Sequence, residues 1–329
     1  MSDFPFYREK AEGPPAAPVA LPRSPLEDLR DASHYQPSKA LAKAVNVALL
    51  LGQPLLVTGE PGTGKTELAG SLAWQLGYGR PVRFEARSTS EAKDLFYNFD
   101  TLGRFHAEES ARGRAADFIR YHALGRAILR TRALPEVAEV LPTAELARHD
   151  GPAASVVLID EIDKAPRDFP NDILNEIERL EFTIPELGYR PIQADPAFRP
   201  VILLTSNAEK SLPPAFLRRC VYFHIEFPDR ETLDRIVESR VGQFPGRGLV
   251  AGVIDFFLEL RSEENGLRKK PATAELLGWI SYLHRRGADP SKPLKYCRET
   301  AAESLGILVK EREDYTVASG LLQTFLKKS

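Results

Sequence analysis

The sequence predicts an α/β fold: a parallel sheet with helices on both faces, followed by a small all-helical domain. Short apolar runs of strand length alternate with segments of helical periodicity as far as about residue 228. This alternation is typical of a parallel sheet whose strands are buried on both faces. Beyond residue 228 only helical spacing remains, so the sequence predicts a boundary there.

Each predicted element follows from its own pattern. Apolar runs predict five strands, and apolar residues at helical spacing predict a helix after the first strand, from Leu68 to Leu76, and another between the third and fourth strands, at 169–180. Helical patterns then fill 231–240, 250–260, 273–284 and a stretch after residue 300. The five predicted strands lie at 55–57, 82–84, 156–159, 201–204 and 221–225.

Proline usage sets the first residues apart. Five prolines fall between residues 14 and 25, which favours an extended arm over a packed element. We therefore divide the chain into a proline-rich arm at 1–30, an α/β domain at 31–228 and a helical domain at 229–329. A disordered tail is favoured over a strap that packs on a neighbouring subunit.

Composition narrows the class of protein. The chain has 329 residues, is 43% hydrophobic and carries a net charge of −2, so no overall field attracts nucleic acid or an acidic membrane. Two cysteines are too few for a disulfide framework, which favours a reducing compartment. No apolar run reaches the length of a membrane span, and the first residues lack the apolar core of a signal peptide. We expect a cytoplasmic protein.

The stretch GEPGTGKT fits the phosphate-binding pattern G-x-x-x-x-G-K-[ST] between a predicted strand and a predicted helix. Glycines allow the backbone to approach a ligand, and consecutive N–H groups at a helix start can hold phosphate oxygens. The lysine reaches the β- and γ-phosphates of ATP, and the threonine hydroxyl holds Mg²⁺. A plain glycine turn is the alternative, and the flanking elements argue against it. The predicted nucleotide-binding residues are Gly59, Glu60, Pro61, Gly62, Thr63, Gly64, Lys65 and Thr66.

Acidic residues end the third predicted strand in the run VVLIDEID. An acid at the end of a strand beside a phosphate loop holds Mg²⁺, and Asp160 has that position. Glu161 can accept a hydrogen bond from a water aligned on the γ-phosphate, as general base or water-positioning residue. A solvated helix start is the alternative for an acidic run, and the preceding phosphate loop favours the catalytic interpretation.

Two further signals follow in order along the chain. The fourth strand ends in TSN, where Asn207 is predicted to contact the γ-phosphate or the attacking water; alone, an asparagine turn would explain it. The run PPAFLRRC then places Arg218 and Arg219 at the end of a short helix. An arginine there can reach a neighbouring subunit's nucleotide and stabilise transition-state charge, or it can cap the helix.

Together, these four signals resemble the AAA+ ATPases and, among them, the MoxR-like family, from about Tyr35 to the C-terminus. GEPGTGKT resembles Walker A, LIDEID resembles Walker B, TSN resembles sensor 1, and the arginine pair matches the arginine-finger position, with Arg219 favoured. The resemblance implies a P-loop AAA+ domain with a helical lid. It also implies a homo-oligomeric ring, commonly a hexamer, that binds ATP and Mg²⁺ at subunit interfaces.

The resemblance extends to two inserts and has one departure. Segments at about 88–146 and 182–199 resemble MoxR-like inserts, the second as a hairpin. Family members carry a sensor 2 arginine at the start of a lid helix, but Pro271 falls near that place here. Lys270 or Lys269 is expected to replace it, or the contact is missing.

Functional alternatives remain open at this point. The leading hypothesis is an ATP-driven remodelling or chaperone-like machine whose partner carries a von Willebrand factor A domain, as such partners are common in the family. The second is a nucleotide-gated binding module, next to an effector of a bacterial conflict system, with little turnover. The third is a nucleic-acid motor, which only the seven arginines between residues 104 and 132 favour; a solvated or partner-docking face explains them better.

The insert also holds an aromatic run. Phe96, Tyr97 and Phe99 are interpreted as hairpin core rather than as grips on a substrate chain. The six histidines show no metal-ligand spacing, so no zinc site is proposed.

Overall fold

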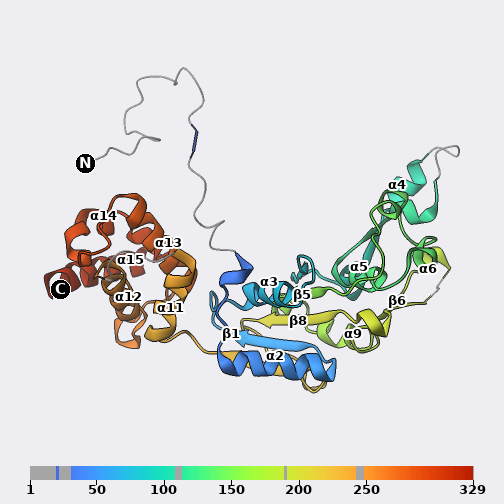
Figure 1. Ribbon diagram of the computed structural model, residues 1–329, viewed down its shortest axis with the longest axis horizontal. Coiled ribbons are helices and arrows are strands. Elements are labelled where there is room, and N and C mark those ends of the chain that lie inside the picture. The colour runs from blue at the N-terminus through green and yellow to red at the C-terminus, as the bar shows by residue number, and fades with distance from the viewer. Residues whose placement is uncertain (1–19, 22–30, 108–112, 189–190, 242–247, 329) are drawn as a thin grey trace.

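A computed structural model of the chain describes residues 20–21, 31–107, 113–188, 191–241 and 248–328. The predicted arm at residues 1–30 therefore lies almost wholly outside the described residues. Figure 1 shows a central sheet with a helical domain at one end and the insert that follows the second strand of the sheet at the other. Within the described ranges, every helix falls short of the length or apolar character that crossing a bilayer requires.

The central sheet confirms the predicted α/β fold. Its five strands are all parallel, in the order β2-β5-β8-β1-β9, and each contains one of the predicted apolar runs. Because the strands are parallel, their carboxyl ends meet at one edge of the sheet, which is where ligands bind in such folds. The strands are β1 (Leu55–Gly59), β2 (Val82–Glu85), β5 (Val156–Asp160), β8 (Val201–Ser206) and β9 (Val221–Ile225).

Alternate residues of the strands feed two separate cores, as the period of two requires. Leu56, Ile159 and Leu204 face the core that also holds the inserts. Val57 and Leu158 face the core beneath α2 (Lys39–Leu51) and α3 (Lys65–Gln75). Strands buried on both faces explain why the predicted runs are continuously apolar.

The remaining helices mostly match the predicted segments. The predicted single helix at 169–180 is instead two short helices, because Ile173 ends one and Leu180 adopts a left-handed conformation with φ of 52°. The helices of the α/β domain after α3 are α4 (Thr101–His106), α5 (Ala123–Arg130), α6 (Leu134–Val137), α7 (Thr143–Leu146), α8 (Phe169–Asp172), α9 (Leu174–Arg179) and α10 (Pro214–Leu217).

Each insert contains a two-stranded antiparallel hairpin. The first pairs β3 (Tyr97–Phe99) with β4 (Ile119–Tyr121), and the second pairs β6 (Glu181–Thr183) with β7 (Pro191–Gln193). The inserts pack on one another, since the rings of Phe96 and Phe182 stack with centroids 5.3 Å apart. Phe96 and Tyr97 are buried, which confirms the interpretation of these two aromatics as hairpin core.

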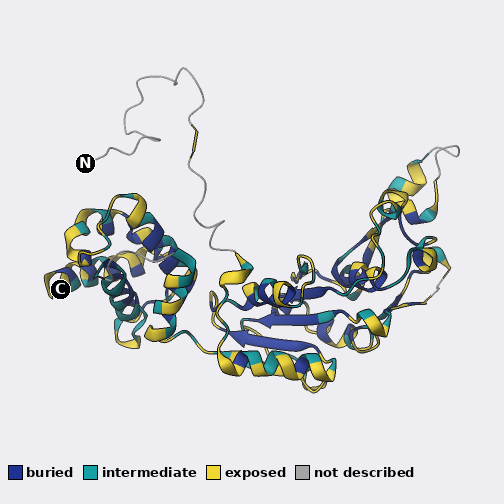
Figure 2. Cartoon of the chain, in the orientation of Figure 1, coloured by how far each residue is buried: buried dark blue, intermediate teal, exposed yellow. Residues whose placement is uncertain are grey.

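The C-terminal helices form a separate domain with its own core (Figure 2). Trp279 is fully buried there, and its indole N–H donates to the Ser304 hydroxyl at 2.9 Å. The change from strands to helices falls between β9 and the first lid helix. The lid helices are α11 (Arg230–Val241), α12 (Gly248–Arg261), α13 (Thr273–Arg285), α14 (Arg298–Glu303) and α15 (Arg312–Lys328).

Candidate functional site

The glycine loop connects the carboxyl end of β1 to the start of α3. Gly62 and Gly64 have φ of 77° and 85°, a left-handed conformation in which a side chain is strained. The Lys65 ammonium lies within the loop, donating to the carbonyls of Gly59 at 2.7 Å and Glu60 at 2.8 Å. Burial lowers the pKa of Lys65, and nearby carboxylates oppose that shift. The loop thus holds a cation beside the N-terminal N–H groups of an 11-residue helix, an arrangement that attracts phosphate.

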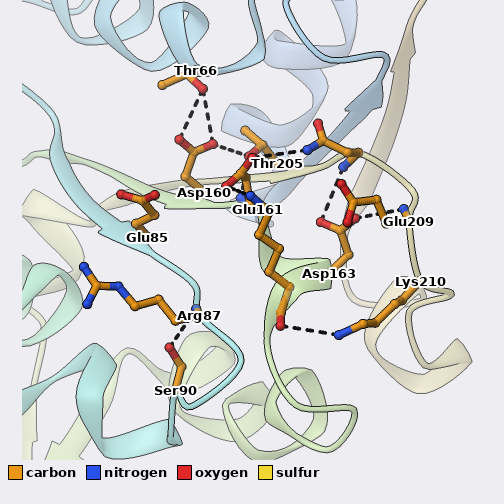
Figure 3. A network of polar contacts seen from close by, with 12 residues as sticks. Thr66, Glu85, Arg87, Ser90, Asp160, Glu161, Asp163, Thr205, Glu209 and Lys210 are labelled. Carbon is orange, nitrogen blue, oxygen red and sulfur yellow. Dashed lines mark hydrogen bonds and ion pairs between the residues drawn. The ribbon is translucent and has the colours of Figure 1, made fainter. Parts of the chain in front are cut away.

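Asp160 ends β5 opposite the loop and is 2% exposed. Both of its oxygens lie 3.2 Å from the Thr66 hydroxyl, which donates to them (Figure 3). The Thr205 hydroxyl, from β8, also donates to Asp160, and Arg83 on β2 forms an ion pair with it at 2.7 Å. Side chains from the two neighbouring strands, β2 and β8, and from the helix after the loop therefore orient one carboxylate.

Glu161 follows directly, with φ of 55°. A non-glycine residue in the left-handed region costs about 1–3 kcal/mol, and such strain clusters at functional sites. Its N–H donates to the Thr205 hydroxyl at 2.9 Å, so the residue that orients Asp160 also holds this backbone. The turn aims the Glu161 carboxylate away from β5 toward Lys164 and Asn207.

The Glu161 carboxylate is hydrogen-bonded at both oxygens. Lys164 donates to one oxygen at 2.6 Å, and the side-chain amide of Asn207 donates to the other at 3.2 Å. The Lys164 hydrogen bond lowers the pKa of Glu161, burial opposes it, and Asn207 adds to the lowering. Glu161 is therefore a carboxylate at neutral pH, able to accept a hydrogen bond from water.

Asn207 lies just beyond β8, where the turn is fixed by a second acid. The Asn207 N–H donates to Asp163 at 3.4 Å, and the Glu209 N–H donates to the other oxygen of Asp163 at 3.0 Å (Figure 3). Asp163 is 2% exposed. The two acids that follow Asp160 in the run VVLIDEID, Glu161 and Asp163, therefore have different roles. Asp163 holds the backbone, and Glu161 presents its carboxylate to the site.

The donor set at this edge fits Mg²⁺ and a nucleotide. Magnesium takes hard oxygen ligands from one or two protein groups and completes its shell with waters and phosphates. The Asp160 carboxylate and the Thr66 hydroxyl are such ligands, and they already lie together. Lys65 and the loop N–H groups are donors that can bind the phosphate oxygens. When bound, Mg²⁺ would neutralise charge that develops on the phosphate oxygens.

A cavity of about 660 Å³ opens beside the loop, between the α/β domain and the lid. Its volume is typical of a small-molecule site, and its lining is mostly apolar, as suits a nucleoside. Apart from residues of the glycine loop, such as Gly64, the sequence did not indicate these walls, although an aromatic and an amide residue precede the first helix. Its walls include Tyr35, Gln36, Gly64, Phe227, Thr273 and Leu277.

The two predicted finger arginines follow α10 and are exposed. Arg219 pairs with Glu178 of its own chain at 3.1 Å and donates to the Ala215 carbonyl at 3.2 Å. Neither arginine is joined to the loop by a hydrogen bond or ion pair among the described residues. Their exposure suits contact with another molecule, and the finger assignment stays a prediction.

Lys270, the predicted sensor 2 replacement, pairs with Glu263 inside the lid. The structure brings a different lid cation to the loop. Arg261, the last residue of α12, forms an ion pair with Glu60 at 2.5 Å. The missed site residues are thus Arg261, Lys164, Thr205 and Arg83; Thr205 alone carried a sequence signal, two residues before Asn207.

Comparison with known proteins agrees with this geometry. The family described as AAA domain (dynein-related subfamily) matches residues 54–220, which include the loop, both acids and Asn207. No curated protein sequence matches the chain.

Solved structures similar to the chain include three with the following measures. Brucella abortus NtrX in complex with ADP has a TM-score of 0.47 at 16% identity, covering 92% of this chain and 63% of that one. Thermotoga maritima RuvB, a Holliday junction branch migration motor, has a TM-score of 0.44 at 14% identity, covering 84% and 69%. The S. cerevisiae Hsp104–ADP complex has a TM-score of 0.43 at 18% identity, covering 82% and 49%.

Proposed function

The chain belongs to the AAA domain family, dynein-related subfamily, and we propose that it binds ATP with Mg²⁺ and hydrolyses the γ-phosphate. The observation that carries this proposal is the strained backbone of Glu161. A left-handed glutamate held by a buried threonine is costly, and its effect here is to present a carboxylate beside Asn207, close to the phosphate loop.

Each residue has a role that follows from its position. The loop N–H groups and Lys65 bind the β- and γ-phosphates, once Lys65 exchanges its carbonyl partners for phosphate oxygens. Thr66 and Asp160 hold Mg²⁺. Glu161 orients the attacking water and accepts its proton, and Asn207 fixes the rotamer of Glu161 or contacts the γ-phosphate.

We further propose a ring of identical subunits, commonly six, in which Arg219 reaches the neighbour's nucleotide. Its exposure supports this, because Glu178 binds only one edge of the guanidinium. Such an arginine contributes about 10³–10⁵ in rate. Hydrolysis would then depend on assembly.

The work of the ring, in this proposal, is MoxR-like remodelling of a cytoplasmic partner protein with a von Willebrand factor A domain. The first insert supports a protein partner. Leu102 and Phe105 on α4 are 71% and 74% exposed, and they lie three residues apart on one helix face, where a partner protein could bury both.

A nucleotide-gated module with little turnover is the second candidate. The observation in its favour is that Lys164 and Asn207 already satisfy both oxygens of Glu161. In that state the carboxylate is less available to water, and a partner would have to release it.

One experiment separates these candidates: ATP hydrolysis per subunit over a wide range of protein concentration, with Arg219→Ala and Arg218→Ala as a matched pair. The ring ATPase is supported if specific activity rises with protein concentration in wild type and in Arg218→Ala but not in Arg219→Ala. Tight ATP binding with negligible turnover at every concentration, even with partner present, supports the gated module. Absence of ATP binding contradicts both.

A further inference from the structure

Arg261 of the lid has three partners, of which Glu60 and Phe227 precede the lid in the chain and Pro271 belongs to the lid itself. One amino group of its guanidinium pairs with Glu60 at 2.5 Å, and the other donates to the Pro271 carbonyl at 2.6 Å. The guanidinium carbon lies 3.3 Å from the centre of the Phe227 ring. The Arg261 side chain is only 9% exposed, so this planar cation is held at its face and at two edges.

Glu60 is also one of the two residues whose carbonyls hold the loop lysine. Its carbonyl accepts from the Lys65 ammonium at 2.8 Å and from the Thr63 hydroxyl at 2.9 Å. Its carboxylate accepts from Arg261. A single residue therefore connects the phosphate-binding cation, through the backbone, with the lid, through the side chain.

The lid and the loop are also in van der Waals contact near this ion pair. A Cβ added to Gly62 would lie 2.3 Å from the Ala272 Cβ, at the start of α13. The 660 Å³ cavity is bounded by the same loop, the same helix and the segment around Phe227. Arg261 thus contacts Phe227, which lines the cavity, and Glu60, which belongs to the loop that bounds it.

We propose that Arg261 is a positioning residue that couples the lid to the nucleotide loop through Glu60, a role that rests on the proposed ATP site. To reach the phosphates, Lys65 must leave the Glu60 carbonyl, which frees that peptide to shift. Because Arg261 holds the Glu60 carboxylate and stacks on Phe227, the shift changes the lid position. In reverse, the lid keeps the loop closed over bound nucleotide.

This role differs from that of a residue that only stabilises the lid. A coupling residue changes nucleotide release, and its effect disappears once Glu60 is neutral. A lid-stabilising residue changes the unfolding temperature, and its effect does not depend on Glu60. The lid offers a matched control, since Arg268 and Glu313 form an ion pair in which the side chains are 67% and 65% exposed.

The experiment uses the full chain with Arg261→Gln, Glu60→Gln, the double variant, Arg261→Lys and Arg268→Gln. The first readout is the dissociation rate of a fluorescent ADP analogue. We expect release about fivefold faster in either single variant, at the low end of typical coupling because Glu60 is half-exposed. The double variant should match the single ones, Arg261→Lys should recover part of the effect, and Arg268→Gln should release like wild type.

The second readout is amide hydrogen exchange of residues 59–66 without nucleotide. Faster exchange in Arg261→Gln and Glu60→Gln, but not in Arg268→Gln, supports the coupling. Glu60→Gln carries the test if Arg261→Gln fails to fold. Release and exchange that stay at the wild-type level, or additive effects in the double variant, would overturn the inference. If wild type binds no nucleotide, the proposed function fails, and the exchange readout still decides whether the lid restrains the loop.

Discussion

The carboxyl edge of the sheet and the lid both contribute residues to the candidate site, but their residues are positioned in different ways. At the sheet edge, Asp160 ends a buried strand, and Lys65 and Asn207 lie in segments that follow two others, so the parallel topology brings them together. At the lid, Arg261 ends a helix within a separate core. Its position depends on how two domains pack, and no strand order fixes it.

The difference shows which functional residues a strand pattern can locate. A residue at a strand end has one place in a parallel sheet, because register and direction are set by the buried runs. In the lid, by contrast, several positions on the helix surfaces could each carry the cation that contacts the loop. Lys270 and Arg261 are both lid cations, and only the structure shows that Arg261 meets Glu60 while Lys270 meets Glu263.

The largest effect should come from removing the loop cation. Lys65→Ala is expected to lower ATP turnover about 100- to 1,000-fold. Removing one preorganised group that stabilises the negative charge of a transition state typically lowers the rate by that factor. Lys43→Ala, which changes an exposed lysine on α2, is the matched control and should keep wild-type turnover. Steady-state hydrolysis measures both. Equal losses in the two variants would contradict the assigned role of the sheet edge.

The next effect concerns Thr205, which is fully buried and bonded to both Asp160 and the Glu161 N–H. Thr205→Val keeps the shape and removes both hydrogen bonds. We expect a loss of about 1–3 kcal/mol in the free energy of unfolding and about a 10- to 100-fold loss of Mg²⁺ affinity or activity. Thr205→Ser should retain most of both. Urea unfolding and Mg²⁺ titration of turnover make the comparison.

A smaller effect distinguishes loop strain from lid contact. Gly62→Ala and Gly77→Ala both place a side chain at positive φ, at 77° and 69°, which costs about 1–2 kcal/mol in stability. Only Gly62 approaches the lid, since open space surrounds Gly77. Gly62→Ala should therefore weaken nucleotide binding about tenfold, and Gly77→Ala should leave it unchanged. Calorimetric titration with ADP measures both affinities. Equal ADP affinities in Gly62→Ala and Gly77→Ala would show that contact with the lid does not affect nucleotide binding.

The smallest effect is expected at Lys270. Its partner Glu263 is 89% exposed, and an exposed ion pair contributes little. Lys270→Gln should change nucleotide release less than about twofold, whereas Arg261→Gln changes it about fivefold. Stopped-flow release of fluorescent ADP compares them. A larger effect at Lys270 would restore it as the sensor 2 replacement and remove the contrast between the two cations.

Much of the fold followed from the sequence because its signals were local. Continuous apolar runs located all five strands of the sheet, and apolar spacing located the main lid helices. The predicted helix at 169–180 was wrong in detail. A left-handed Leu180 and a break at Ile173 leave no periodicity signal.

The part of the candidate site whose residues lie in sequence motifs could be predicted. The loop, Asp160, Glu161 and Asn207 lie in one network, although their catalytic roles stay predictions. The strained φ of Glu161 and the walls of the cavity depend on tertiary packing. They involve residues far apart in the chain, such as Glu161 with Thr205 and Tyr35 with Leu277, which no local pattern connects. The Lys164 contact is local, three residues from Glu161, but no motif pointed to it.

The most direct measurement compares ATP binding and ATP turnover in wild type and Glu161→Gln. The amide keeps the size of the side chain and removes its ability to accept a proton. We expect unchanged ATP affinity and a loss of turnover of about 100-fold or more, since a positioned general base contributes about 10²–10⁴ in rate. Turnover equal to wild type in Glu161→Gln, with ATP still bound, would contradict the central claim.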